Sequence, residues 1–458
     1  MRSLTLWENF ILGKDYLLRY KEVYNFPTLT PEEISAYQFK KIKKLLDIAY
    51  NHTEFYRELY SKRDIHPEDI KTWKDFEKLP TVTKDDIVAS GKNCIVDTKR
   101  NDNSLILSRS SGSSGKLIDI FFEGSSWIEQ ALIQLSMYQR EYNYTGFDKQ
   151  ALIYTSEYPY HSILGLYKAA YINNLTPSDL IIKKLQELQP AVIVCYPSVI
   201  LELIAKFKNE CQRLKPKAIS TNSEQSTQAQ RDFISSVFNC PVHDEYSTEE
   251  LTMVAYQCHN KNYHLLEKPA YVEILDPDSD TVFYNQPGEI VGTCLVNNVM
   301  PFIRYRQGDL GKLSKSDCPC SNNGRILDNI SGRKNSASFI LPNGTKIPSG
   351  KILDLTYTWF LDTKIPILQF QIIQQTKQVI EVIIVADNTY DSLRHNEIIK
   401  SGFKKALGEN LHVIVTRVSE IPKTSAGKHI PIKSYVVADQ VISGKSFQIK
   451  SNMPFAFI

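Results

Sequence analysis

Short apolar runs alternate with helical stretches along the chain from about residue 104 onward. The runs 191–194 and 218–220 have the length of buried strands, and each is followed by a stretch with helical spacing. This alternation is typical of an α/β fold, in which helices are layered on a largely parallel sheet. Strand-like sequence dominates from about 270 to 315, and we expect a β-rich layer there.

The first hundred residues depart from this pattern and read as helical. Thr30, Pro31 and Glu33 form a strong helix start, with an N-cap, a proline at the first helical position and an acidic residue three positions after the cap. Thr83 begins a second start of this kind.

The composition changes again after Arg333. Asn343-Gly344 predicts a hairpin. Further elements are expected as strands at 367–374, 379–385 and 412–418 and a helix at 392–407. We therefore expect an N-terminal core over residues 1–333 and a small, mobile α+β domain over residues 334–458, both within or near the usual range of domain sizes.

Length and composition narrow the classes of function. The chain has 458 residues, of which 42% are apolar and 23% charged, as in globular proteins of two or three domains. A formal charge of +3 gives no support for nucleic acid as a partner. No apolar run approaches the ~20 residues of a membrane span, and we recognise no signal peptide. We expect a cytoplasmic monomer or homodimer.

A loop rich in hydroxyl groups and glycine lies between two strand candidates, 105–107 and 118–122. Its members are Ser110, Ser111, Gly112, Ser113, Ser114, Gly115 and Lys116. Glycine lets the backbone approach a ligand, and hydroxyl, N–H and ammonium groups bind phosphate oxygens. It is not a Walker P-loop, which needs glycine at Ser110 and a hydroxyl residue at Leu117. Taken alone, the loop is better explained as a flexible Ser/Gly connector.

Four further blocks follow in order along the chain. They are 244–250 (Asp-Glu-Tyr-Ser-Thr-Glu-Glu), 301–309 (Pro-Phe-Ile-Arg-Tyr-Arg-Gln-Gly-Asp), 330–333 (Ile-Ser-Gly-Arg) and 421–428 (Ile-Pro-Lys-Thr-Ser-Ala-Gly-Lys). Each one alone is compatible with a charged surface loop. Five blocks in this order are a far stronger signal.

In this order the blocks resemble the adenylate-forming superfamily of acyl-CoA synthetases, peptide-synthetase adenylation domains and luciferases. Within it the chain is most similar to the phenylacetate–coenzyme A ligase-like branch, particularly members encoded with capsular-polysaccharide genes. The local sequence that supports this branch is at 49–57, 79–84, 195–198 and 222–224. The resemblance covers nearly the whole chain and implies a large N-terminal domain with a small C-terminal lid.

The resemblance also implies roles for individual residues. Residues 110–116 would hold the β- and γ-phosphates of ATP, and Tyr246 would stack on adenine, with Ser223 and Glu224 lining the base. Asp309 would accept hydrogen bonds from the ribose, and Arg333 would reach the ribose or phosphate. The remaining assignments are Asp244, Glu245, Ser247 and Thr248 to the nucleotide, Glu249 or Glu250 to Mg²⁺, and Lys334 to the hinge.

Lys428 is the expected catalytic residue. A carboxylate that attacks a phosphate brings two anions together, and an ammonium placed between them offsets their repulsion. The resemblance puts this lysine on the small domain, so closure of that domain would assemble the site. Without the other blocks, Lys428 would read as an ordinary solvated lysine in a loop.

Cysteine and histidine form a separate candidate site. Cys258 and His264 lie in one turn-like segment, and Cys318 and Cys320 in another. Three thiols and one imidazole are a standard set for structural zinc, although the spacing alone is equally compatible with unrelated cysteines. The resemblance favours zinc, because many members of this branch have a Cys/His cluster at these places.

The chain departs from the superfamily pattern in three places. Ser247 stands where glycine is usual, so either Glu249 or Glu250 aligns with the magnesium ligand. The segment 150–190 is rich in tyrosine and lacks the Gly-rich segment of phenylacetate ligases, so phenylacetate is not the expected substrate. The arginine that usually follows the terminal lysine is absent.

The function that the resemblance implies is ATP-dependent activation of a small carboxylic acid. The acyl-adenylate would form with release of pyrophosphate, and the acyl group would pass to a thiol, such as coenzyme A, or to an amine. Two alternatives remain at this stage. One is an adenylyltransferase that leaves AMP on its product, and the other is a non-catalytic binding protein that keeps the fold.

Overall fold

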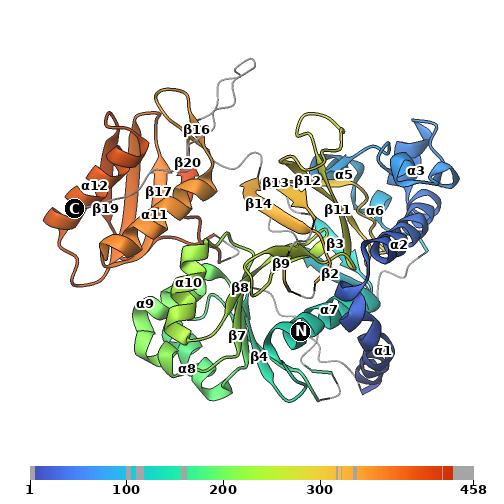
Figure 1. Cartoon of the computed structure of the whole chain (residues 1–458), viewed down its shortest axis with the longest axis horizontal. Helices are drawn as coiled ribbons and strands as arrows, with labels where there is room; N and C mark the ends of the chain where they lie inside the picture. The colour runs from blue at the N-terminus through green and yellow to red at the C-terminus, as the bar shows by residue number, and fades with distance from the viewer. Residues whose placement is uncertain are drawn as a thin grey trace.

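The computed structural model describes residues 6–99, 105–109, 118–155, 162–163, 165–315, 318–320, 322–333, 338–424 and 427–436. A large body contains most of the chain, and the C-terminal elements from β15 onward form a smaller body beside it (Figure 1). Within the described residues, no helix combines the length and the apolar character needed to cross a bilayer.

The N-terminal region is helical, as expected. Its helices are α1 (Leu6–Asn25), α2 (Pro31–His52), α3 (Glu54–Ser61), α4 (Trp73–Phe76), α5 (Lys84–Ser90) and α6 (Lys92–Ile95), with 3-10 turns at Phe26–Thr28 and Pro67–Asp69. The capping box predicted for α2 is present: the Thr30 hydroxyl accepts from the Glu33 N–H at 3.2 Å, and the Glu33 carboxylate accepts from the Thr30 N–H at 2.8 Å. Thr83 caps α5 in the same way.

A single hydrogen-bonded sheet runs through the large body in the order β11-β12-β13-β14-β10-β9-β8-β7-β6-β4-β5, with β1 beside β13. Its parallel part consists of β4 (Lys149–Tyr154), β5 (Lys168–Asn173), β6 (Val192–Cys195), β7 (Ala218–Asn222) and β8 (Val242–Thr248). All residues of β6 and β7 are buried. This explains the continuous apolar run of β6, whereas β7 ends in three buried polar residues.

Helices cover the parallel strands. Three of them, α8 (Ser178–Leu188), α9 (Pro197–Arg213) and α10 (Gln228–Phe238), lie together on one side, whereas α7 (Gly124–Tyr142) lies on the other side with α1 (Figure 1). The apolar faces of these helices and strands share one hydrophobic core. This arrangement confirms the α/β fold class.

The remaining strands of the sheet are antiparallel. They are β9 (Thr252–Gln257), β10 (Tyr263–Leu265), β11 (Ala270–Leu275), β12 (Gly288–Cys294), β13 (Tyr305–Ser314) and β14 (Ile326–Arg333), with β1 (Val82–Thr83) parallel to β13. They pack on a second hydrophobic core with α2, α3 and the separate hairpin β2 (Ile106–Arg109)–β3 (Asp119–Phe122). The expected β-rich layer is therefore present, and it is joined to the parallel strands by the β8–β9 hairpin.

The C-terminal body has its own sheet and its own core. Its elements are β15 (Phe339–Ile340), β16 (Lys346–Ile347), α11 (Ser349–Thr363), β17 (Ile367–Gln374), β18 (Val379–Ala386), α12 (Ser392–Leu407), β19 (His412–Arg417) and β20 (Ile432–Ser434). The sheet order is β19-β18-β17-β20, and a hydrophobic cluster from Phe339 to Ile432 fills the space beneath the two helices. This is the small α+β unit that the sequence predicted.

Candidate active site and candidate metal centre

The carboxyl ends of the parallel strands meet at one edge of the sheet. The strand order reverses at β4, which has β5 on one side and β6 on the other. Ligands in open α/β sheets bind outside the carboxyl ends of the strands at such a reversal. The residues that directly follow the five strands are Asn174 after β5, Thr155 after β4, Tyr196 after β6, Ser223 after β7 and Glu249 after β8.

Glu249 lies at this edge, next to Ser108 on β2. The Ser108 hydroxyl, on β2, donates a hydrogen bond to the Glu249 carboxylate at 2.7 Å. The pKa of Glu249 is raised, because the surrounding protein disfavours its charge and because Glu250 repels it, whereas Ser108 and Lys428 act in the opposite direction. Residues 110–116 lie outside the described residues, and only the paired ends of β2 and β3 that flank them are placed.

The second glutamate of this block has different surroundings. Glu250 is buried, and its carboxylate accepts a hydrogen bond from the Tyr305 hydroxyl at 3.2 Å. Glu249 as a whole residue is exposed to solvent, although protein atoms lie close enough around its carboxylate to raise its pKa. The two candidates for the magnesium ligand are therefore distinguished by accessibility.

Tyr246 and Asp309 lie side by side, although 63 positions separate them in the sequence. The Tyr246 hydroxyl donates to Asp309 Oδ2 at 2.7 Å and accepts from Gln307 Nε2 at 2.9 Å. Gly308, which lies between Gln307 and Asp309 on β13, has φ +87, a value that non-glycine residues rarely adopt. The backbone of Arg333 pairs with Asp309 in the β13–β14 ladder. The Arg333 side chain and Lys334 lie outside the described residues.

The two acidic residues before Tyr246 point into the protein instead. The Asp244 carboxylate accepts hydrogen bonds from Thr221, Ser226 and Tyr263 at 2.8 to 3.0 Å. The Glu245 carboxylate accepts from Tyr138 at 2.8 Å and Ser220 at 2.5 Å. Burial raises the pKa of both acids. The structure does not bring either carboxylate together with the Tyr246–Asp309 pair.

The two residues after Tyr246 end β8, directly before the turn at 249–251 that leads into β9. The Thr248 hydroxyl accepts a hydrogen bond from the Leu251 N–H at 3.1 Å, and Ser247 is half-buried at a β-bulge.

Lys428 reaches the same edge of the sheet from the C-terminal body. Its Nζ donates to the Ser223 carbonyl at 3.2 Å and lies 5.7 Å from the centre of the Tyr196 ring. Ser223 has φ +63, a left-handed backbone in which its carbonyl accepts this bond. The ammonium group is also near enough to Glu249 to lower the pKa of that carboxylate.

Glu224 has a role that the sequence did not predict. Its carboxylate accepts from the Ser198 N–H and hydroxyl at the start of α9, at 3.1 and 3.0 Å, and from the His429 N–H at 2.8 Å. Burial raises its pKa, and these hydrogen bonds and Lys428 oppose the shift. Both carboxylate oxygens are thus already bonded within the protein, and the expected place of Glu224 beside the base stays a prediction.

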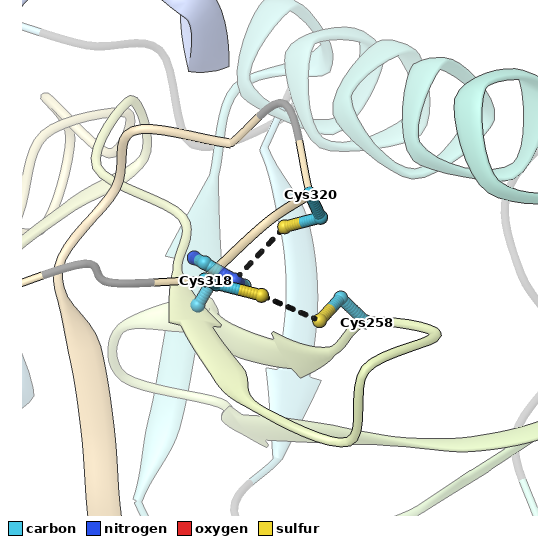
Figure 2. Close-up of side chains that lie close together, drawn as sticks. Cys258, Cys318 and Cys320 are labelled. Carbon is cyan, nitrogen blue, oxygen red and sulfur yellow. Dashed lines mark hydrogen bonds between the residues drawn. The ribbon is translucent and has the colours of Figure 1, made fainter.

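Cys258, His264, Cys318 and Cys320 converge, with all four ligand atoms within 4.8 Å of one another. Figure 2 shows the three cysteines, with Cys258 on the β9–β10 turn and the other two on the β13–β14 connection. The Cys258 and Cys318 sulfurs are 3.6 Å apart, close to the ~3.8 Å edge of a tetrahedron with Zn–S bonds of ~2.3 Å.

The histidine of this cluster is oriented for a metal. His264 Nδ1 donates to the Gly324 carbonyl at 3.1 Å, and Nε2 lies 3.1 Å from the Cys320 sulfur. A backbone carbonyl that holds one ring nitrogen leaves the other as the ligand. The donor set and its geometry therefore fit a structural zinc ion.

Comparisons with known proteins agree with this architecture. Residues 339–435 match the family model described as the CapK C-terminal domain. Protein CapK of Staphylococcus aureus is 24% identical over 411 residues, which cover 85% of this chain and 87% of that protein. Phenylacetate-coenzyme A ligase of Escherichia coli (strain K12) is 25% identical over 334 residues, covering 68% of this chain and 74% of that protein.

Solved structures show the same fold. A 2-hydroxyisobutyryl-CoA ligase in the postadenylation state, in complex with R3-HIB-AMP, has a TM-score of 0.74 at 18% identity and covers 90% of this chain and 91% of its own. The same ligase in the thioesterification state, with 2-HIB-AMP and CoA, has a TM-score of 0.59 and covers 89% and 91%. The fold is that of the adenylate-forming CoA ligases, and the resemblance seen in the motifs is confirmed.

Proposed function

We propose that this chain activates a carboxylic acid with ATP and then transfers the acyl group to a thiol or an amine. The observation that carries this proposal is the position of Lys428. Its ammonium group lies at the carboxyl edge of the parallel strands, within hydrogen-bond distance of Ser223 and near Glu249. A positive charge placed there in advance stabilises an attack between two anions.

The other residues of the edge have complementary roles in this proposal. Asp309 holds the ribose, and Tyr246 exchanges its hydrogen bond with Asp309 for a contact with adenine. Glu249, which is exposed and accepts a hydrogen bond from Ser108 on β2, is the better placed of the two glutamates to hold Mg²⁺ with the phosphates of ATP. The buried Glu250 supports the site through Tyr305.

The reaction would proceed in two steps. The substrate carboxylate attacks the α-phosphate, the bond to the pyrophosphate leaving group breaks, and an acyl-AMP forms. A thiol or amine then attacks the acyl carbon and AMP leaves. The TM-scores support an arrangement other than that of the second step, because the same relative is more similar in its postadenylation state than in its thioesterification state. Coenzyme A is the thiol that the names of the relatives favour.

The Cys/His cluster is proposed to hold zinc with a structural role. It joins the β9–β10 turn to the β13–β14 connection, and no residue of the Lys428 edge belongs to it. Four protein ligands leave no open coordination position for substrate.

Acid-dependent exchange between pyrophosphate and ATP tests the proposal. We expect exchange with some member of a panel of aryl, aliphatic and amino acids, and a loss of roughly 10²- to 10³-fold in Lys428→Ala. Lys433→Ala, which removes the next lysine along the chain, is the matched control and should retain exchange. Full acyl-AMP formation by Lys428→Ala would contradict the assignment. Adenylate transfer without any acid would indicate the adenylyltransferase alternative.

A further inference from the structure

The segment that carries Lys428 is held on the large body by contacts on both sides of the lysine. Before it, Lys423 Nζ lies 2.9 Å from Glu202 Oε2. After it, the His429 N–H donates to Glu224 Oε1 at 2.8 Å. Next to it, Asn174 Nδ2 donates to the Gly427 carbonyl at 3.4 Å. These partners are more than 200 positions away in the sequence.

We propose that Glu202 and Glu224 are positioning residues that hold the Lys428 segment in the arrangement for acyl-AMP formation. This inference rests on the proposed function, and it adds that the two carboxylates set how much of the time the enzyme spends in that arrangement. We refer to the contacts of Lys423 with Glu202 and of His429 with Glu224 as the latch.

The Glu202 carboxylate accepts hydrogen bonds from its own body as well as from Lys423. Glu202 lies on α9, its side chain is only 13% exposed, and it also accepts from Lys206 at 2.8 Å and from the Ser178 hydroxyl. Burial alone would raise the pKa of Glu202, but the hydrogen bonds from Lys206, Lys423 and Ser178 outweigh it and lower the pKa to about 2. The carboxylate is therefore ionised at neutral pH, and Ser178 and Lys206 fix its position whether or not Lys423 is present.

Glu224 is the acceptor on the other side of Lys428, and its environment differs from that of Glu202, because burial raises the pKa of Glu224. Its carboxylate caps the N-terminus of α9 through Ser198, where the helix dipole favours a negative charge. One of its oxygens also accepts the His429 N–H, directly after the lysine. The imidazole of His429 bonds back to the Phe370 carbonyl in the C-terminal body at 2.8 Å. A displacement of this segment would therefore break bonds in both bodies.

Gly427 explains why the fit is close. It has φ +69, and a Cβ there would overlap the Asn174 amide. The segment can approach the sheet edge only because this position has no side chain. Lys428 thus lies between a close backbone contact and two carboxylate contacts, which together fix the position of its ammonium group.

The latch affects the two half-reactions differently. Acyl-AMP formation brings two anions together and needs Lys428 at the edge, whereas in acyl transfer a neutral thiol or amine attacks the acyl carbon, so no repulsion between two anions has to be offset. A weaker latch should slow the first step and leave the second unchanged or faster. A residue with only a structural role would instead reduce both steps or destabilise the fold.

Hydrogen exchange of the segment 419–431 measures the latch without any substrate. In Glu202→Gln and in Lys423→Gln, we expect about tenfold less protection of the amides in this segment, because a charged hydrogen bond between the two bodies is lost. Lys423→Arg keeps the charge and should keep most of the protection. Lys208→Gln, an exposed lysine on the same helix, is the control and should match the wild type.

Kinetics of the separate half-reactions give the second readout. We expect Glu202→Gln and Lys423→Gln to reduce acid-dependent pyrophosphate exchange about tenfold and to leave transfer from supplied acyl-AMP unchanged. Unchanged protection in Glu202→Gln, or an equal loss of both half-reactions, would overturn the latch. If the wild-type protein shows no acid-dependent exchange, the proposed function fails, and hydrogen exchange still decides whether the latch exists.

Discussion

At the scale of single residues, charge determines what this edge of the sheet can do. Two unit charges about 4 Å apart repel each other by ~4 kcal/mol at an effective dielectric near 20. The substrate carboxylate and the α-phosphate must overcome this repulsion. Lys428 is held where its ammonium group can offset it, over Tyr196 and against the Ser223 carbonyl.

Glu249 provides a prediction at this scale. We expect Glu249→Gln to raise the Mg²⁺ concentration needed for acid-dependent exchange by about tenfold, because a neutral amide is a weaker ligand than a carboxylate. The raised pKa of Glu249 means that this ligand becomes protonated at a higher pH than an ordinary glutamate. Exchange should therefore decline as the pH falls, and Glu249→Gln should reduce this dependence. Magnesium titrations at several pH values measure both effects.

Glu250→Gln is the matched control for this experiment. Its side chain is buried against Tyr305, so the substitution should affect stability more than the requirement for magnesium. If Glu250→Gln shifts the magnesium requirement and Glu249→Gln does not, the two assignments must be exchanged.

The sequence predicted some of these residues and missed others for clear reasons. Lys428, Tyr246 and Asp309 stand in motifs, and the structure places Tyr246 against Asp309 and brings Lys428 to the same sheet edge, although their roles stay predictions. Glu202 and Asn174 stand in no motif, because their contacts exist only after folding brings distant segments together. The sequence motif assigned Glu245 to the nucleotide together with Tyr246. Consecutive side chains of a strand point to opposite faces, however, and the Glu245 carboxylate is bonded to Tyr138 and Ser220.

At the scale of elements, the antiparallel part of the sheet depends on two turns that have little apolar material of their own. The β9–β10 turn and the β13–β14 connection meet at the Cys/His cluster. A zinc ion there would stabilise these two connections in place of apolar packing, because its ligands would link the β9–β10 turn to the β13–β14 connection.

We therefore expect about one equivalent of zinc in freshly purified protein. Cys318→Ser should lose most of the metal and lower the midpoint of thermal unfolding by roughly 3 to 8 °C, since a bound ion stabilises the folded state. Elemental analysis and a thermal melt measure these effects. Cys240→Ser, at a buried cysteine outside the cluster, controls for loss of a thiol. Zinc content below about half an equivalent would contradict the site.

Elements with strong local signals were predicted and weakly marked ones were missed. The Asn343-Gly344 hairpin, β17 and α12 follow from turn chemistry and periodicity. The helices α7 and α11 have no side-chain N-cap, so nothing in the sequence marks where they begin. The short strand β20 exists because it pairs with β17, a contact that local sequence cannot reveal.

At the scale of the whole molecule, the two bodies meet along the helices of the large one. Helix α9 contacts β17 and α10 contacts α11, so the C-terminal body rests on the same helices that present Glu202 and the start of α9 to the Lys428 segment. The helices that contact the C-terminal body are therefore also the helices that border the sheet edge where Lys428 lies.

Ionic strength should affect this arrangement. The Lys423–Glu202 pair is partly exposed, with side-chain exposures of 24% and 13%, so salt screens part of its attraction. We expect the amide protection of the segment 419–431 to fall about threefold between roughly 0.05 and 0.5 M NaCl. Lys423→Gln should show little of this dependence. An equal response of the variant and the wild type would mean that the ion pair does not hold the segment.

Steric contact at Gly427 limits how closely the two bodies can approach each other. The hydrogen on its α-carbon fits against the Asn174 amide where a methyl group would collide. How closely the backbone that carries Lys428 can approach the large body is therefore set by the contact of Gly427 with the side chains of Asn174 and Leu175. Substitutions in other parts of the protein that change its acid specificity would then leave the position of the Lys428 ammonium group unchanged.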